Sequence, residues 1–383
     1  MHILYVIDAV KGAPIVHTYG SCKHLAKMGH RIDLITNAPP EQFRGIGVNV
    51  YSVPDIKCKH PAIRIIFNDI MLFFKSLFKG CDVIYTRNAL LAALFKIVRY
   101  NTPVVWEVNG LSSVELPLLG YNNPLKIRFA KFLEEKLLPC LVDRLVVVTN
   151  GVGGVLLKSG APKEKIHLVR NGVDYREFDP MKKRKDIRSL YNISDSEIVI
   201  IFVGKIYAWH GVEHMFKILG RVLREKKNVK LLFVGDRKEE LDAKLQRLIT
   251  ELSLSNNIIF TGWIDNNDVP DYIAAADVGI HTGMHGYELN PIKVLEYMAA
   301  SKPAIGTAFG LNQLITESSG GIVIDPLDYE DSARRILGLI NNFDTMKKFG
   351  RNAREYVIRN HDWEKVTADL ESALKSIADV KKA

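Results

Sequence analysis

Two consecutive stretches, Val278-Gly-Ile-His281 and Gly286-Tyr-Glu-Leu-Asn-Pro-Ile-Lys-Val-Leu-Glu-Tyr-Met-Ala299, carry the pattern that decides the fold. The first is a short apolar run typical of a buried β-strand. The second passes from a glycine-containing loop into apolar residues at helical spacing, with Asn290 suited to the N-cap and Pro291 to the first turn. A strand that leads through a loop into a helix is the unit from which parallel sheets are built.

The same strand–helix unit recurs along the whole chain. Short apolar runs alternate with amphipathic stretches of helical length, such as Gly20–Gly29 and Leu90–Arg99. Each half holds enough of these runs for a sheet of its own, so we predict two doubly wound α/β domains with helices on both faces of parallel sheets. The expected strands are Ile3–Ile7, Ile32–Thr36, Val83–Tyr85, Val104–Val108, Leu145–Val148, Ile198–Val203, Val229–Val234, Ile258–Phe260, Val278–His281, Pro303–Gly306 and Ile322–Ile324.

A charged segment marks the boundary between the two halves. Asp179–Lys185 reads Asp-Pro-Met-Lys-Lys-Arg-Lys, with a proline and no apolar periodicity. We therefore predict one domain over residues 1–178 and a second over residues 179–361. From Asp344 onward the chain reads as one or two helices with a break near His361 and Asp362.

Composition and targeting signals bound the class and the compartment. Of the 383 residues, 47% are hydrophobic and 25% are charged, which excludes a disordered tail, a collagen-like fibre and a coiled coil. The N-terminus lacks the features of a signal peptide, and no uncharged apolar run reaches the roughly 18 residues that cross a bilayer. Free buried thiols in a reducing cytosol are expected, with two disulfides as the open alternative. The cysteines concerned are Cys22, Cys58, Cys81 and Cys140. We predict a cytoplasmic protein.

Positive charge is concentrated in the first half of the chain. The whole chain has 52 Lys and Arg against 43 Asp and Glu, a net charge of +9. Residues 1–180 hold 23 basic and 15 acidic residues, or +8, and the remainder holds 29 and 28, or +1. A basic half fits nucleic acid, a membrane or an anionic substrate. Because no nucleic-acid motif or aromatic–basic interleaving is present, we predict no nucleic-acid partner.

Residues that directly follow the strands of the first half are candidates for binding, because ligands of open parallel sheets lie beyond the carboxyl ends of the strands. Gly12 lies in the loop after the first strand, where a glycine lets backbone approach a phosphate or a sugar. The fourth expected strand runs into Glu107 and Asn109. We expect them to point opposite ways, which would turn one of them toward a ligand. The two residues alone favour the alternative, which is a solvent-facing Glu107 and a turn-making Asn-Gly.

In the second half, Gly204 and Lys205 follow the strand Ile198–Val203, and His210 lies in the same loop. The glycine permits close backbone approach, and the positive side chains suit a diphosphate leaving group. The alternative is a solvated lysine and a histidine satisfied locally.

Two carboxylates accompany the helix that begins near Pro291. Glu288 lies in the loop just before the helix N-terminus, which is an anion site. Glu296 lies further along, on an apolar stretch where an unpaired carboxylate is costly. It therefore either accepts two hydroxyl groups of a ribose or forms an ion pair with Lys293 or another base.

Other chemistries find little support in the sequence. The histidine pairs His210/His214 and His281/His285 have i,i+4 spacing, but Gly283 and Gly286 make the second segment a loop, so we predict no metal site. No Walker-type lysine loop or nucleophile elbow is present.

In their order along the chain, these residues resemble the family-four retaining glycosyltransferases of the GT-B fold. The central motif is Glu-x7-Glu from Glu288 to Glu296, followed by Tyr-Met-Ala-Ala-Ser-Lys-Pro303. Supporting stretches are Ser21–His30, Asn171–Asp174, Phe260–Trp263 and Ala276–Gly279. The resemblance covers nearly the whole chain. It implies two Rossmann-like domains facing across a cleft, with a C-terminal helix, residues 362–383, crossing back to complete the first domain.

The resemblance implies transfer of a sugar from a UDP-sugar or GDP-sugar to a hydroxyl group of a glycan or lipid-linked acceptor, with the anomeric configuration retained and no metal or other cofactor. We favour same-face attack, in which the departing phosphate takes the proton of the acceptor, and double displacement stays open. A GT-B-fold sugar-nucleotide epimerase and a non-catalytic nucleotide-sugar-binding subunit are the competing hypotheses.

The resemblance also implies a role for each candidate residue. Glu288 contacts the donor sugar near the anomeric centre, Glu296 holds the ribose, and Asn109 lies near the acceptor hydroxyl. Trp263 and Ile264 bracket the base. The diphosphate is neutralised by Lys205, helped by His210 and by backbone N–H groups of Leu289, Asn290 and Pro291. The expected donor-binding set is Gly12, Gly204, Lys205, His210, Trp263, Ile264, Glu288, Leu289, Asn290, Pro291 and Glu296, and the expected catalytic set is Glu288, Lys205 and Asn109.

The chain departs from the commonest family pattern at three of these positions. Arginine is usual where Lys205 stands, lysine where His210 stands, and histidine is frequent where Asn109 stands. Lysine lacks the planar fork of arginine, and histidine is only partly charged at neutral pH.

Two stretches of the basic half, Ala62–Lys79 and Pro124–Lys136, combine apolar and basic residues. Our hypothesis is that one of them lies on an anionic membrane surface at the inner face of the plasma membrane and presents a lipid-linked acceptor. The alternative is that both are buried helices of the first domain.

Overall fold

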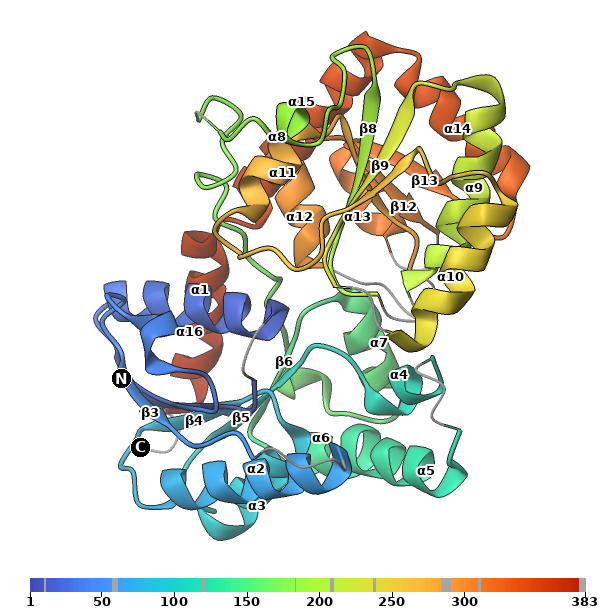
Figure 1. Cartoon of the computed structure of the whole chain (residues 1–383). Coiled ribbons are helices and arrows are strands. Elements are labelled where there is room, and N and C mark those ends of the chain that lie inside the picture. Colours follow the sequence, from blue (N-terminus) through green and yellow to red (C-terminus); the bar gives the residue numbers. More distant parts are fainter. Residues whose placement is uncertain are drawn as a thin grey trace. The chain divides into compact units, whose positions relative to one another are not determined.

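The computed structural model describes residues 1–9, 12–56, 61–118, 122–182, 184–206, 210–236, 239–283, 291–308 and 311–378, with backbone only for 61–63 and 239–242. The chain forms two compact units (Figure 1). The first comprises Met1–Pro117, Tyr121–Gly172 and Trp363–Ala383, and the second comprises Leu118–Gly120 and Val173–Asp362.

The first unit is built on a seven-stranded parallel sheet with the strand order β3-β2-β1-β4-β5-β6-β7. Its strands are β1 (His2–Ile7), β2 (Arg31–Thr36), β3 (Asn49–Ser52), β4 (Val83–Thr86), β5 (Val104–Val108), β6 (Arg144–Val147) and β7 (Ile166–Leu168). The sequence pattern missed β3 and β7. Both are short edge strands without a fully buried residue, so they carry no apolar run.

Helices cover both faces of this sheet. The helices α1 (Ala13–Lys27) and α16 (Trp363–Ala378) lie on one face, and α2 (Pro61–Leu77) and α3 (Ala89–Val98) lie on the other (Figure 1). The remaining helical segments are η1 (Pro40–Phe43), α4 (Ser112–Leu118), α5 (Pro124–Phe132), η2 (Leu133–Leu137), α6 (Leu138–Leu141), α7 (Asn150–Lys158) and η3 (Lys163–Lys165).

Trp363 attaches the C-terminal helix α16 to the first unit. A Cβ atom at Gly20 of α1 would lie 2.2 Å from its ring, and one at Gly172 would lie 2.5 Å from it. Both positions must therefore lack a side chain for the tryptophan to pack between them. The expected break before this helix is confirmed, because α15 (Phe343–Asn360) ends just before His361.

The second unit is built on a six-stranded parallel sheet with the order β10-β9-β8-β11-β12-β13. All six expected strands are present, as β8 (Ile198–Val203), β9 (Val229–Val234), β10 (Ile258–Phe260), β11 (Val278–His281), β12 (Ala304–Thr307) and β13 (Gly321–Ile324). The other helices of this unit are α8 (Ile187–Leu190), α9 (Val212–Glu225), α10 (Glu239–Glu251), α11 (Val269–Ala275), α12 (Ile292–Ala299), α13 (Asn312–Ser318) and α14 (Tyr329–Ile340).

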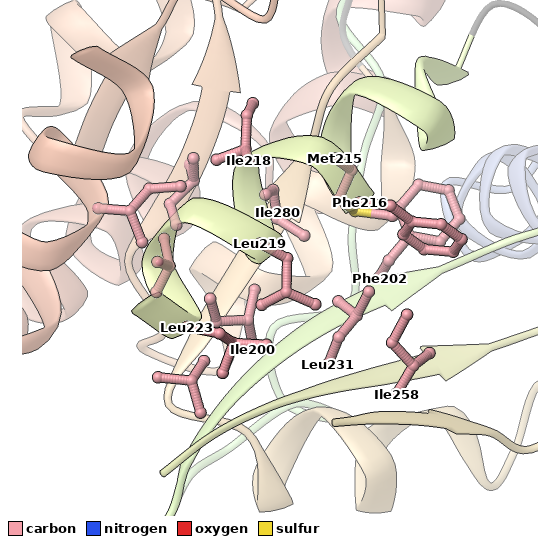
Figure 2. Packing of buried hydrophobic residues seen from close by; sticks show 14 of the residues in the cluster. Ile200, Phe202, Met215, Phe216, Ile218, Leu219, Leu223, Leu231, Ile258 and Ile280 are labelled. Carbon is pink, nitrogen blue, oxygen red and sulfur yellow. The ribbon is translucent and has the colours of Figure 1, made fainter. Parts of the chain in front are cut away.

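Alternate residues of β8 feed two separate cores. Ile200 and Phe202 pack with Leu219 and other residues of α9 on one face of the sheet (Figure 2). Val199 and Ile201 pack on the opposite face, in the cluster that includes residues of α12 and α15. A strand buried on both faces is apolar at every position, which is why the sequence showed it as a continuous run.

The cysteines and the helix hydropathy complete the description. Cys22, Cys81 and Cys140 are free thiols, as expected, but only Cys22 is buried and Cys140 is exposed, so the prediction of buried thiols was wrong there. Cys58 lies outside the described residues. Among the described helices, none combines the length and the apolar character needed to cross a lipid bilayer.

Candidate functional site

The strand order of the second sheet reverses between β8 and β11, which is where ligands bind in doubly wound sheets. Gly204 follows β8 with φ 134°, and Gly235 follows the neighbouring β9 with φ 140°. A Cβ atom at Gly235 would lie 2.4 Å from the carbonyl oxygen of Gly204. The two loops therefore meet backbone to backbone at this edge, and both positions require glycine.

Tyr297 holds α12 against the end of β8. The backbone N–H of Val203 donates to the Tyr297 hydroxyl at 2.8 Å. Gly279 on β11 leaves room for the ring, because a Cβ atom there would lie 2.1 Å from it. This contact brings the first turn of α12 to Gly204, and Glu296 lies one turn further along the same helix.

Glu296 is a partly buried carboxylate without a partner of its own in the described part of the chain. No hydrogen bond or ion pair joins it to another described residue, and the ion pair with Lys293 that the sequence left open is not formed. Burial raises the pKa of Glu296 to about 7, and the charge of Lys293 opposes this only in part. Such a group can accept hydrogen bonds from ligand hydroxyls.

Three cationic side chains differ in their placement around Gly204. Lys205 is exposed, whereas His210 is buried with its ring 5.4 Å from that of Phe202. Lys293 of α12 places its Nζ 3.5 Å from His210 Nε2. The sequence had considered Lys293 only as a partner of Glu296. Its signal was a lone lysine in the first turn of an otherwise apolar helix.

The loop before α12 was the strongest candidate in the sequence. Glu288, Leu289 and Asn290 lie outside the described residues. Pro291 is the N-cap residue of α12, with φ −72° and ψ 127°, rather than a residue of the first turn. Proline has no backbone N–H, so the expected hydrogen bond from Pro291 to a phosphate was wrong.

The two residues expected to bind the base, Trp263 and Ile264, differ in exposure. Trp263 is 60% exposed, whereas Ile264 packs against the core on the α12 face of the sheet. Trp263 is therefore the member of the pair whose ring is open to a ligand.

In the first unit, Gly12 and the ends of β4 and β5 form a second cluster. Gly12 is the N-cap of α1 with φ 84°, and its carbonyl accepts from the N–H groups of Ile15 and Val16 at 3.0 and 3.2 Å. Arg87 follows β4 and donates to the Pro14 carbonyl at 3.3 Å. Because β1 and β4 are neighbours at the point where this strand order reverses, the loop of Gly12 is at the corresponding ligand-binding edge.

Glu107 is the centre of that cluster. It is 1% exposed and accepts a hydrogen bond from Asn109 Nδ2 at 2.7 Å and another from the Tyr85 hydroxyl. Arg87 Nε lies 3.3 Å and His17 Nδ1 lies 3.6 Å from its carboxylate. Burial alone would raise the pKa of Glu107, but the neighbouring His17 and Arg87 and the two hydrogen bonds hold it below its usual value.

This geometry corrects the prediction for Glu107 and Asn109. They were expected to point opposite ways, with a solvent-facing glutamate as the alternative, and both expectations were wrong. Residues two apart on a strand share a face, so the two side chains point the same way and bond to each other. The partly buried amide of Asn109 is thereby oriented by a fully buried carboxylate.

No group of three or more metal-ligating side chains occurs in the part of the chain that the structure describes. The site residues that it does bring together are Gly204, His210 and Lys293 in the second unit, and Gly12, Arg87, Glu107 and Asn109 in the first.

Comparison with known families finds two matches that together span most of the chain. The family described as Glycosyltransferase Family 4 matches residues 15–177, and that described as Glycosyl transferases group 1 matches residues 183–356. An uncharacterized glycosyltransferase of Methanocaldococcus jannaschii is 24% identical over 348 residues, 88% of this chain and 87% of its own length. The sulfoquinovosyl transferase SQD2 of Arabidopsis thaliana is 24% identical over 372 residues, 93% of this chain and 69% of its own.

Solved structures match the fold over nearly the full length. Anabaena HepE in complex with UDP-glucose is similar with a TM-score of 0.80 and 16% identity, covering 98% of this chain and 100% of that one. WaaG, a glycosyltransferase involved in lipopolysaccharide biosynthesis, is similar with a TM-score of 0.70 and 17% identity, covering 99% of each chain.

Proposed function

The chain belongs to glycosyltransferase family 4, a retaining family with the GT-B fold that uses nucleotide-sugar donors, and from this premise we propose how it works. In our proposal it moves a sugar from a nucleotide-diphosphate sugar to a hydroxyl group of a glycan or lipid-linked acceptor without a metal ion. Residues 179–361 bind the donor, and residues 1–178 with 362–383 receive the acceptor.

The observation that carries the donor assignment is the state of Glu296. A partly buried carboxylate with a pKa near 7 and no hydrogen-bond donor among the described residues can accept hydrogen bonds from a ligand. Two ribose hydroxyls would satisfy it. In this proposal the exposed Lys205 and the buried His210 bind the diphosphate, and the exposed Trp263 binds the base.

The proposed reaction needs charge stabilisation more than a protein nucleophile. The bond between the anomeric carbon and the phosphate oxygen breaks, and the acceptor oxygen bonds to the same face of that carbon. The acceptor proton passes to the departing phosphate oxygen. Lys205, His210 and the N-terminus of α12 stabilise the charge that develops on the diphosphate. In this proposal Glu288 lies near the anomeric carbon. Double displacement would instead require a carboxylate to attack that carbon.

Asn109 and Gly12 serve the acceptor side in this proposal. The Glu107 carboxylate accepts from the Asn109 amide, and Arg87 links the same carboxylate to the first turn of α1. In this proposal the acceptor hydroxyl therefore binds beside side chains that the protein already holds in position.

A panel of UDP-, GDP- and ADP-sugars tests the function. We expect one donor class to bind and to be hydrolysed slowly without acceptor, and UDP-glucose comes first because HepE was solved with it. Glu288→Ala should mainly slow the release of sugar. If no nucleotide sugar binds at millimolar concentration the proposal fails, and release of an epimerised sugar nucleotide would favour the epimerase instead.

The membrane part of the proposal is supported by exposed apolar side chains on α2 and α5, which lie on the same side of the first sheet (Figure 1). The helix α5 has no buried residue, so the alternative of two buried helices is wrong for it. The exposed apolar residues are Ile65, Ile66, Phe67, Ile70, Phe74 and Phe78 on and after α2, and Leu125, Phe129 and Phe132 on α5. Exposed Lys75, Lys126, Arg128 and Lys131 accompany them. Apolar anchors among basic residues fit the cytoplasmic face of an anionic membrane, where a lipid-linked acceptor would lie.

Vesicle flotation tests this surface. The chain should float with phosphatidylglycerol-containing vesicles and much less with pure phosphatidylcholine, and the pair Phe74→Ser and Phe129→Ser should abolish flotation. Leu190→Ser, at an exposed position of the second unit, is the matched control and should have no effect. Equal flotation with anionic and neutral vesicles would contradict the membrane proposal.

A further inference from the structure

Lys293 occupies an unusual place for a lysine. Its Nζ lies 4.4 Å from the centroid of the Phe202 ring and 3.5 Å from His210 Nε2. Phe202 is fully buried in the core beneath α9 (Figure 2). The Lys293 amino group therefore packs against the ring of a buried phenylalanine at the end of β8.

Gly204 leaves the space that Lys293 uses. A Cβ atom at Gly204 would lie 2.6 Å from Lys293 Nζ and 3.3 Å from its Cε. The absence of a side chain at Gly204 thus admits a charged group from α12 to the strand end at which a ligand is expected to bind.

No carboxylate of the described residues forms an ion pair with Lys293, and its polar neighbour is the imidazole of His210. Burial lowers the pKa of Lys293 to about 7, and the more distant Glu296 opposes the shift only in part. A lysine held beside a histidine in this way lacks an anion among the described residues.

We propose that Lys293 is a third cationic residue of the donor site, which acts with Lys205 and His210 on the diphosphate. The inference rests on the proposed function and deepens it. A diphosphate at the end of β8 would supply the missing anion to Lys293. A bound diphosphate would favour the charged form of Lys293, which would add to the partial positive charge of a histidine at neutral pH.

Calorimetric titration with a nucleoside diphosphate, the monophosphate and the nucleoside of the same base tests the inference. The base is chosen by titrating the wild-type chain with UDP, GDP and ADP. The Lys293→Met variant loses one charge-assisted contact, so its affinity for the nucleoside diphosphate should be about tenfold or more below that of the wild type. Nucleoside binding should change less than about twofold, since the base and ribose contacts remain. Lys293→Arg should recover part of the loss.

Lys348→Met on α15 is the matched control, because it removes the same charge from an exposed lysine of the same unit. It should bind all three ligands like the wild type. Diphosphate binding by Lys293→Met that equals the wild type overturns the inference and leaves the proposed function standing. Equal losses for the nucleoside and the diphosphate also overturn it, because they indicate a structural role. A wild type that binds no nucleoside diphosphate overturns the proposed function and the inference with it.

Discussion

Glu107 in the first unit is fully buried and Glu296 in the second is partly buried, and the two carboxylates have different surroundings. Glu107 is surrounded by an arginine, a histidine, a tyrosine and an amide, which lower its pKa. Glu296 has no hydrogen bond to another described residue, and its pKa rises to about 7. The first carboxylate is bonded within the protein, whereas we propose that the second binds a ligand. Burial of a carboxylate alone therefore does not indicate a binding site, and it is the lack of described partners that supports our proposal for Glu296.

The largest expected effect is the loss of stability when Glu107 is neutralised. In Glu107→Gln, the partly buried Arg87 loses its carboxylate, and one of the two donors, Tyr85 or Asn109, loses its acceptor, so we expect a loss of about 3 kcal/mol in the free energy of unfolding. Urea unfolding followed by circular dichroism measures it.

Glu330→Gln is the control for that change, because Glu330 pairs with Arg221 at the surface. It should cost less than about 1 kcal/mol. If the Glu107→Gln variant is as stable as this control, the contacts of Glu107 with its partners do not stabilise the fold.

A smaller effect of the opposite kind is expected for Glu296→Gln. Removing a carboxylate without partners leaves the melting temperature unchanged or raises it, because the cost of desolvation disappears. Affinity for the donor nucleotide should fall roughly 10- to 100-fold, since hydrogen bonds from ribose to a charged acceptor are lost. Calorimetry and thermal unfolding measure the two quantities on the same samples. A lower melting temperature with unchanged affinity would make Glu296 a structural residue like Glu107.

The sequence predicted the parallel α/β architecture because central strands are apolar along their whole length. It missed β3 and β7, whose residues are only partly buried and so leave no apolar run. The distinction between Glu107 and Glu296 was beyond the sequence for a different reason. Arg87 and Tyr85 reach Glu107 from a neighbouring strand, and such contacts between residues about 20 positions apart leave no local pattern.

The surroundings of Lys293 could not be predicted from the sequence for the same reason. In the sequence it stands three residues from Glu296, which left an ion pair between them as an alternative. The structure places it against Phe202, Gly204 and His210 instead, because the hydrogen bond from Val203 to Tyr297 ties α12 to the end of β8. These contacts depend on the packing of α12 against β8, two elements that are far apart in the sequence.

The pKa of Glu296, with and without nucleotide, tests the contrast between the two carboxylates most directly. It can be measured by NMR titration of the chain with ¹³C-labelled glutamate carboxyls, using Glu296→Gln to assign the resonance. We expect a midpoint of about 7 in the free protein, against an ordinary value of 4.5. The bound nucleoside diphosphate should lower it, because ribose hydroxyls donate to the ionised form, and affinity should accordingly rise as the pH increases towards 7. A midpoint near 4.5 that does not move when nucleotide binds would contradict the assignment of Glu296 as an open ligand site.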